Sequence, residues 1–210
     1  MDKQQHWQSV YATRDAAHTS WFRPHLDESL RLLDALDLPK DAPIIDVGGG
    51  RATLVDDLLA RGFGDVSVLD LSAAALEEAR ERLGARGDAV RWLAADATAV
   101  ALPPAHYGLW HDRAVFHFLV DPDDRARYVA NAVRSVRPHG HVIVGCFAPD
   151  GPERCSGLPV HRYDASALAE VFAPAFAIVR HGRELHATPA GAVQPFTYVV
   201  LQRCHDAMSA

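Results

Sequence analysis

Short apolar runs that alternate with helical segments constrain this chain most strongly. The expected strands are residues 44–47, 66–69, 90–93, 107–110 and 141–147, with helices at 52–61, 73–83 and 122–136 and a turn at 137–140. Strands separated by helices pair in parallel, through right-handed crossovers that cover both faces of the sheet. The pattern therefore predicts a three-layer α/β fold around a mostly parallel sheet.

The two ends of the chain depart from this alternation. Leucines recur at helical spacing from Leu26 to Leu36, and Pro24 suits the first turn of that helix. After a helix at 164–172, apolar runs at 176–181 and 196–202 are joined only by a loop over 183–195. Such a pair favours an antiparallel carboxy-terminal hairpin, which ends a seven-stranded sheet. We expect one domain over 1–210, made of a helical cap (1–40), a core (41–147) and a final loop, helix and hairpin (148–210).

Composition narrows the classes of function. The chain has 210 residues and a formal net charge of −6, which disfavours nucleic-acid binding because that binding depends on a basic surface. The first residues are polar, and no run of ~18 apolar residues suggests a membrane span. Three cysteines without a CxxC pair indicate neither a disulfide framework nor a zinc site. We therefore expect a cytoplasmic protein that needs no metal, nucleic acid or membrane.

Glycines and acidic residues mark three consecutive strand ends. Asp46 is followed by Gly48, Gly49 and Gly50 directly after the first strand, whereas Asp70 and Asp96 end the second and third. In an open parallel sheet, ligands bind beyond the carboxyl ends of the strands. Glycine lets a backbone turn approach a ligand closely, and a carboxylate accepts hydrogen bonds from ribose hydroxyls. The three features together predict a nucleoside-containing cofactor at this edge.

The runs IIDVGGGRATLVDDLL, VSVLDLS and RWLAADAT resemble the cofactor motifs of class I S-adenosylmethionine-dependent methyltransferases. The resemblance covers about residues 40–150 and implies a Rossmann-like fold that binds S-adenosylmethionine. The family pattern is acid-x-Gly-x-Gly-x-Gly; Asp46, Gly48 and Gly50 match it, and Ala52 replaces the third glycine.

The resemblance also assigns roles to individual residues. Gly48 and Gly50 would flank the methionine part of the cofactor, and Asp46 would bind its amino group directly or through water. Asp70 would hold the ribose hydroxyls. Asp96 would contact the adenine amino group, beside the backbone amide of Ala97. The expected cofactor-binding set is completed by Gly49, Leu71 and His111.

A nicotinamide-binding Rossmann domain is the rival interpretation. Its fingerprint is G-x-G-x-x-G, but counting from Gly48 and Gly50 leads to Thr53 rather than a third glycine. A Tyr-x-x-x-Lys pair is also missing, since lysine occurs only at positions 3 and 40. The methyltransferase interpretation is therefore preferred.

The methyl acceptor is expected beyond the fourth strand, where residues 110–118 read WHDRAVFHF. His111, Asp112 and His117 are candidates to orient or deprotonate an acceptor. The alternative is a purely structural role, in which Asp112 and Arg113 form a local ion pair and His117 packs in the core. This segment is not the Asn-Pro-Pro-Tyr type found in amino-group DNA methyltransferases, which argues against base methylation.

Two further segments are expected to contact the acceptor. Tyr11, Trp21 and Phe22 are candidate walls of a pocket under an amino-terminal cap, whereas Trp7 is expected to pack the cap onto the sheet. The loop over 147–163 follows the fifth strand and carries Arg154 and Arg162, which could bind an anionic acceptor.

Three functions remain open at this point. A small-molecule methyltransferase is favoured because no binding domain is appended to the compact chain. A protein methyltransferase of the lysine type is the alternative, since the amino-terminal Ser20-Trp21-Phe22 element is similar to such enzymes, although His111-Asp112-Arg113-Ala114 replaces their usual Asp-Lys-Gly stretch. A cofactor-binding module without catalysis is the third. The sequence predicts neither the acceptor nor the oligomeric state.

Overall fold

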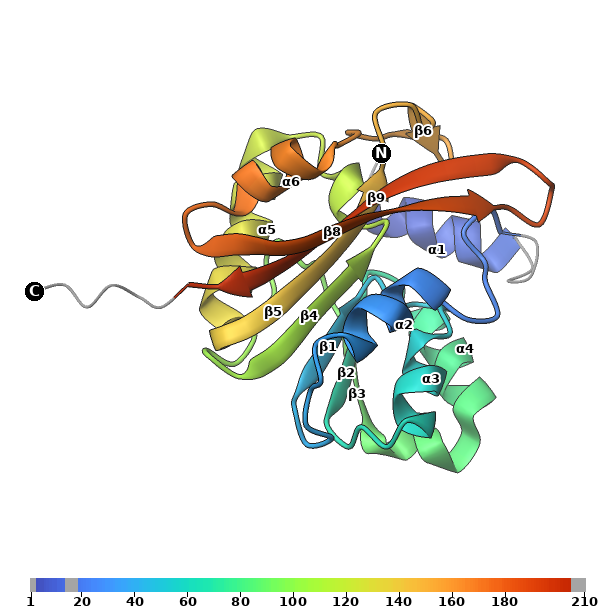
Figure 1. The fold of residues 1–210 in the computed structure, drawn as a ribbon. Helices are drawn as coiled ribbons and strands as arrows, with labels where there is room; N and C mark the ends of the chain where they lie inside the picture. Colours follow the sequence, from blue (N-terminus) through green and yellow to red (C-terminus); the bar gives the residue numbers. More distant parts are fainter. Residues whose placement is uncertain (1–2, 14–18, 205–210) are drawn as a thin grey trace, which may run out of the picture.

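The chain folds around a seven-stranded sheet with the order β3-β2-β1-β4-β5-β9-β8 (Figure 1). The structure is a computed structural model, and it describes residues 3–13 and 19–204. The strands are β1 (Ile44–Val47), β2 (Val66–Asp70), β3 (Val90–Ala94), β4 (Tyr107–Arg113), β5 (Val136–Phe147), β8 (Phe176–Ala187) and β9 (Val193–Arg203). The first five pair in parallel, and β9 pairs antiparallel with both β5 and β8. The expected mostly parallel sheet with an antiparallel carboxy-terminal hairpin is confirmed.

Helices cover both faces of this sheet, which makes the fold Rossmann-like. They are α1 (Lys3–Thr13), α2 (Asp27–Asp34), α3 (Leu54–Ala60), α4 (Ala73–Leu83), α5 (Pro122–Ser135) and α6 (Ala165–Phe172), with short 3-10 turns η2 (Gly84–Ala89) and η3 (Phe116–Phe118). Neighbouring residues of β1 point to opposite faces, so Ile44 joins the core under α2 and α3 while Ile45 joins the core under α5 and α6. None of the helices in the described ranges is long and apolar enough to cross a membrane.

Local sequence fixes the ends of several helices. Ser72 caps α4, because its hydroxyl accepts a hydrogen bond from the backbone N–H of Ala75 at 3.2 Å. Gly84 ends the same helix with a φ of +57°. Asp121 and Asp164 cap α5 and α6 in the same way. These caps lie at or next to the expected boundaries.

Four expected boundaries were wrong. β4 continues from residue 110 to Arg113, β5 already begins at Val136 in the expected turn, and most of the expected loop 183–195 belongs to β8 and β9. The helix expected at Pro24 begins at Asp27. The end of β4 was placed too early because its last residues are polar, as in a loop, but residues from other elements bury them. Pro195 fits β9 because it pairs there with Leu185 of β8, beyond the last residue that pairs with β5.

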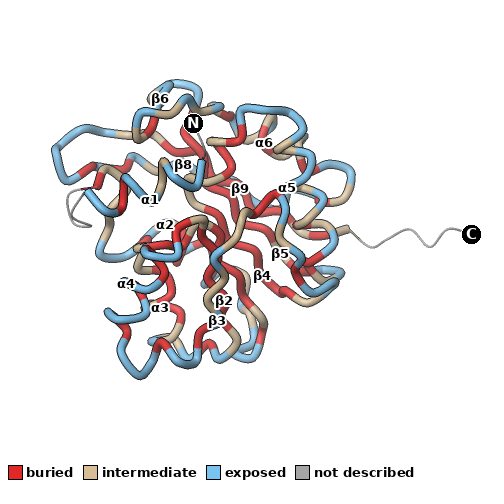
Figure 2. Tube along the Cα trace, turned by 180° about the vertical axis from the view of Figure 1, so that it is seen from behind, coloured by how far each residue is buried: buried red, intermediate tan, exposed pale blue. Residues whose placement is uncertain are grey.

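The interior of the sheet is buried along its length, while the outer surfaces of the helices are exposed (Figure 2). The carboxyl ends of β1, β2, β3 and β4 meet at one edge. Helix α1 and a small two-stranded hairpin, β6 (Arg154–Cys155) with β7 (Leu158–Pro159), lie over this edge in Figure 1. This edge holds the principal cavity described next.

Candidate active site

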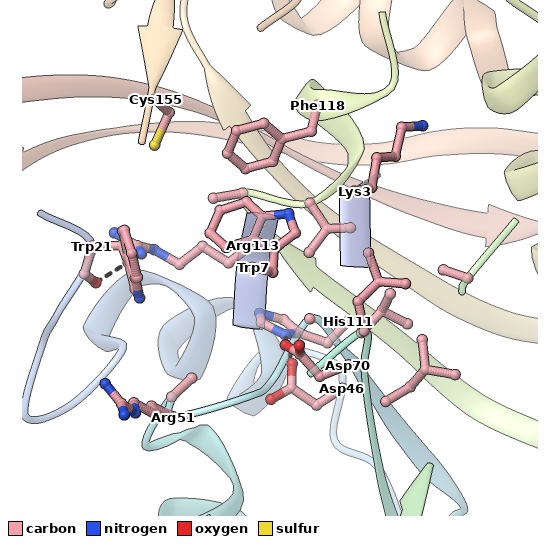
Figure 3. Close-up of a pocket in the computed structure, with 18 of the residues that line it drawn as sticks. Lys3, Trp7, Trp21, Asp46, Arg51, Asp70, His111, Arg113, Phe118 and Cys155 are labelled. Carbon is pink, nitrogen blue, oxygen red and sulfur yellow. Dashed lines mark hydrogen bonds and ion pairs between the residues drawn. The ribbon is translucent and has the colours of Figure 1, made fainter. Parts of the chain in front are cut away.

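A cavity lies at the carboxyl ends of the parallel strands, where the sequence predicts ligand binding (Figure 3). Its lower part, as drawn, holds the carboxylates of Asp46 and Asp70, and its upper part holds aromatic side chains and Cys155. Ten of the expected site residues line it: Tyr11, Trp21, Phe22, Asp46, Gly48, Asp70, Leu71, Asp96, Ala97 and His111. The strand ends and the amino-terminal segment therefore meet in one site.

The glycine turn after β1 is required by close packing. Gly48 has a φ of +71°, and a Cβ added there would lie 1.9 Å from Cγ2 of Val115. A Cβ on Gly50, which has a φ of +27°, would lie 2.7 Å from a carboxylate oxygen of Asp70. Side chains are disfavoured at such φ values and have no space here. Gly49 and Gly50 support the turn but are not among the lining residues.

Asp70 places a buried carboxylate at the end of β2. Burial is the main cause that raises its pKa to about 7. The backbone N–H of Ser72, which donates to Asp70 at 2.8 Å, opposes this rise, and the nearby charge of Asp46 adds to it. Tyr11 from α1 packs beside this carboxylate, and the same burial raises the pKa of the tyrosine well above its ordinary value. The site thus holds a poorly solvated acceptor of hydrogen bonds.

Asp46 has one occupied and one unoccupied carboxylate oxygen. Oδ1 lies 2.7 Å from Nδ1 of His111, whose Nε2 lies 2.8 Å from the hydroxyl of Ser29 in α2. With Nδ1–H donating to Asp46, Nε2 is left to accept from Ser29. Oδ2 of Asp46 is buried and has no hydrogen-bond partner among the described residues. A buried carboxylate oxygen without a partner is costly, which fits a cationic group of a ligand at this point.

The other two candidate catalytic residues lie outside the cavity. Asp112 is fully buried, accepts from the backbone N–H of Val115 at 2.9 Å and from the hydroxyl of Tyr128, and has a pKa raised to about 6 by burial. His117 is fully buried beside Phe147, and burial lowers its pKa to about 3. Neither side chain is among those that line the cavity. The expected ion pair of Asp112 with Arg113 does not form either, because Arg113 bonds elsewhere.

The upper part of the cavity contains residues that the sequence analysis did not assign to a site. Trp7 lines the cavity. Its ring meets Trp21 at a centroid distance of 6.0 Å and Phe118 at 5.0 Å, both edge to face. Arg113 and Cys155 also line the cavity. The signal for Arg113 was the period of two along a strand, since residues 111 and 113 of β4 share one face. It was missed because the strand was expected to end at residue 110.

Arg154 and Arg162 are not among the lining residues. Arg162 donates to the carbonyl of Pro149 at 2.9 Å and pairs with Glu153 at 3.1 Å, so it holds the loop together. Arg154 donates to the carbonyl of Gly157 inside the small hairpin. The loop contributes Cys155 rather than an arginine to the cavity.

Comparison with known proteins gives a family for the core of the chain. Residues 44–140 match the family described as methyltransferase domain. No significant match was found among curated protein sequences.

Solved structures share the fold at low sequence identity. One structure comes from work on the conversion of a disulfide bond into a thioacetal group during echinomycin biosynthesis. It is 17% identical, with a TM-score of 0.78 over 99% of this chain and 94% of that chain. A SAM-dependent methyltransferase from Anabaena variabilis is 17% identical, with 0.73 over 97% and 96%. The 1,6-didemethyltoxoflavin-N1-methyltransferase of Burkholderia thailandensis, with bound 1,6-didemethyltoxoflavin and S-adenosylhomocysteine, is 22% identical, with 0.70 over 96% and 84%.

Proposed function

We propose that the chain is an S-adenosylmethionine-dependent methyltransferase of class I and that it transfers the methyl group to a small molecule held in the upper part of the cavity. The proposal is carried by one observation. Aromatic rings line this part of the cavity, where Trp7 meets both Trp21 and Phe118 edge to face. Small-molecule sites are lined mainly by apolar and aromatic side chains, so this lining suits a small acceptor.

The lower part of the cavity fits the cofactor. When bound, S-adenosylmethionine supplies an electrophilic methyl group on a sulfonium. We assign its amino group to the unpartnered Oδ2 of Asp46, its ribose hydroxyls to Asp70, and its adenine end to Asp96 and Ala97. The glycine turn at Gly48 lets the backbone approach without a side chain. Leu71 adds an apolar wall at the same strand end.

We assign His111 to holding the cofactor rather than to moving a proton. Both ring nitrogens are engaged, one by Asp46 and one by Ser29, so neither is available to an acceptor. Tyr11, Trp21 and Phe22 are assigned to the walls of the pocket. These residues exclude water from an in-line displacement and orient the acceptor, which are the tasks that methyl transfer sets for a protein.

The Burkholderia relative supports this proposal, since the same fold there holds 1,6-didemethyltoxoflavin together with S-adenosylhomocysteine. The test is calorimetric titration with S-adenosylmethionine, with NAD as the control. It is followed by mass-spectrometric detection of methylated products from a small-molecule extract and from unfolded and folded protein mixtures. Micromolar binding, about −8 kcal/mol, and methylation of extract components alone are expected. Methylation of protein alone would overturn the proposal.

A further inference from the structure

Charge is sorted along the cavity. The carboxylates Asp46, Asp70 and Asp96 lie at the strand ends in the lower part, where the proposed function assigns them to the cofactor. The charged residues among the remaining lining residues are Lys3, Arg23, Arg51 and Arg113. In Figure 3, Arg51 lies in the lower part near Asp46, whereas Arg113 lies beside the aromatic side chains of the upper part. Among the described lining residues, no carboxylate shares the upper part with Arg113, which favours a negatively charged occupant.

Arg113 is the cation that the fold holds most firmly. Its Nε donates to the hydroxyl of Tyr198 at 3.0 Å, and one Nη donates to the carbonyl of Trp21 at 3.3 Å, the bond drawn in Figure 3. The guanidinium also lies 4.6 Å from the ring centre of Phe196. A cation fixed in this way is already oriented before an acceptor arrives, so little side-chain entropy is lost on binding.

The guanidinium of Arg113 has unused hydrogen-bonding capacity. Its Nη2 is buried without a hydrogen-bond partner among the described residues. Glu184 forms an ion pair with it at 3.8 Å, a distance too long for a hydrogen bond. The side chain is only 5% exposed. A buried donor without a partner is costly, and an anion in the adjoining cavity would satisfy it.

The titratable side chains around the acceptor part are poorly suited to act as bases. His111 is bonded at both nitrogens, and Lys3 forms an ion pair with Asp124. The hydroxyl of Tyr128 donates a hydrogen bond to Asp112, and burial raises the pKa of Tyr128 well above the ordinary value, so it keeps its proton. Cys155 is a buried thiol at the top of the cavity. The pocket therefore suits an acceptor that has already lost its proton before methyl transfer.

We propose, on the premise of the proposed function, that the acceptor is a flat aromatic anion of the phenolate type, seated among Trp7, Trp21 and Phe118 and bound by Arg113. The acceptor loses its proton to water on entry, because the guanidinium stabilises the anion. An electron pair on its oxygen then forms the bond to the methyl carbon. The carbon–sulfur bond breaks, and its electrons remain on sulfur, which becomes a neutral thioether.

Three matched probes test the charge that the pocket prefers: 4-nitrophenol, 4-nitrobenzyl alcohol and 4-nitrobenzylamine. They have similar rings but differ in charge at pH 8, being anionic, neutral and partly cationic. Binding is measured by equilibrium dialysis against the full chain saturated with S-adenosylhomocysteine. We expect the phenolate to bind at least about tenfold more tightly than the alcohol, with the amine weakest. A preference for the amine or the alcohol would overturn the inference.

Variants test the residue. Arg113→Gln is expected to weaken phenolate binding about tenfold, Arg113→Lys to restore part of it, and Arg91→Gln, at an exposed position of β3, to change nothing. S-adenosylhomocysteine binding within about twofold of wild type shows that each variant keeps its cofactor part. If Arg113→Gln does not fold, Arg113→Lys decides, because loss of the planar fork alone should weaken binding measurably. Unchanged phenolate affinity in the folded variants overturns the inference, whereas a wild-type chain that binds no S-adenosylhomocysteine contradicts the proposed function itself.

Discussion

The lower and upper parts of the cavity are built in different ways. The lower part comes from consecutive strand ends within residues 46–98, and its polar groups are carboxylates and backbone amides fixed by tight turns. The upper part gathers single side chains from five separate segments, namely Trp7, Trp21, Arg113, Phe118 and Cys155. The first construction depends on local backbone geometry, whereas the second depends on packing between distant segments.

Because of this difference, substitutions in the two parts should have different effects. On the proposed function, exchange of a carboxylate in the lower part removes a group assigned to the cofactor, so loss of cofactor binding is expected. Exchange of one aromatic ring in the upper part changes the shape of the pocket, while the other lining side chains stay in place. Substitutions in the upper part should therefore change which acceptor is used before they abolish methyl transfer.

The largest effect is expected from Asp70→Ala. Loss of two charge-assisted hydrogen bonds to the ribose should weaken S-adenosylmethionine binding at least about 100-fold, or ~3 kcal/mol. Calorimetry measures this, and Asp88→Ala, which removes an exposed carboxylate paired with Arg80 at 3.2 Å, is the matched control. Unchanged affinity in the Asp70 variant would contradict the assignment of the lower part.

His111→Ala tests the border between the two parts. Without the imidazole, Asp46 loses its Oδ1 partner, and the affinity for S-adenosylmethionine should fall about tenfold. The turnover number at saturating cofactor should stay within about twofold. The exposed His181 of β8 provides the control variant. A fall in turnover with unchanged cofactor affinity would instead support the acid–base role that the sequence suggested.

A smaller effect is expected from Trp21→Ala. The ring contacts Trp7 and Tyr11 at centroid distances of 6.0 and 6.3 Å, and its loss should raise the KM for the acceptor about fivefold, or ~1 kcal/mol. Cofactor affinity should be unchanged. Equal losses of both affinities would show that the two parts are not independent.

The smallest effect concerns stability. The pKa of Asp70 is raised to about 7 in the folded protein, so this group stabilises the fold fully only below its ordinary pKa of 3.8 and loses that contribution as the pH rises through 7. Asp70→Asn should therefore raise the melting temperature of the cofactor-free protein by about 3 °C more at pH 8 than at pH 6. Thermal denaturation of this variant and of Asp88→Asn measures the difference. A pH-independent shift would contradict the raised pKa.

The sequence predicts the lower part well, for a physical reason. Gly48, Asp70 and Asp96 each follow an apolar run, and parallel pairing brings the carboxyl ends of the strands to one edge whatever the distant packing. The same alternation predicts the order of elements and the antiparallel hairpin. The alternation does not predict where an element ends when tertiary contacts extend it, as in β4.

The sequence predicts Tyr11, Trp21 and Phe22 as pocket walls, and all three line the cavity. The places of the polar residues of β4 could not be predicted from local patterns. His111, Asp112 and Arg113 look like a loop because they are polar, yet each is buried in β4 by partners that come from other elements. Arg113 depends on Tyr198 and on the carbonyl of Trp21, which lie 85 and 92 residues away in the chain. No pattern within a short window contains those partners.

The position of β9 has a consequence for the order in which the protein can form during synthesis. This strand is the last of the sheet along the chain, yet it lies between β5 and β8. It also supplies Phe196 and Tyr198, which hold Arg113 in place. Before these residues are translated, the nascent chain contains the glycine turn and Asp70 but lacks the partners that fix the Arg113 guanidinium. The contacts that fix Arg113 can therefore form only after β9 has been translated, and nonsense mutations before residue 193 would remove them.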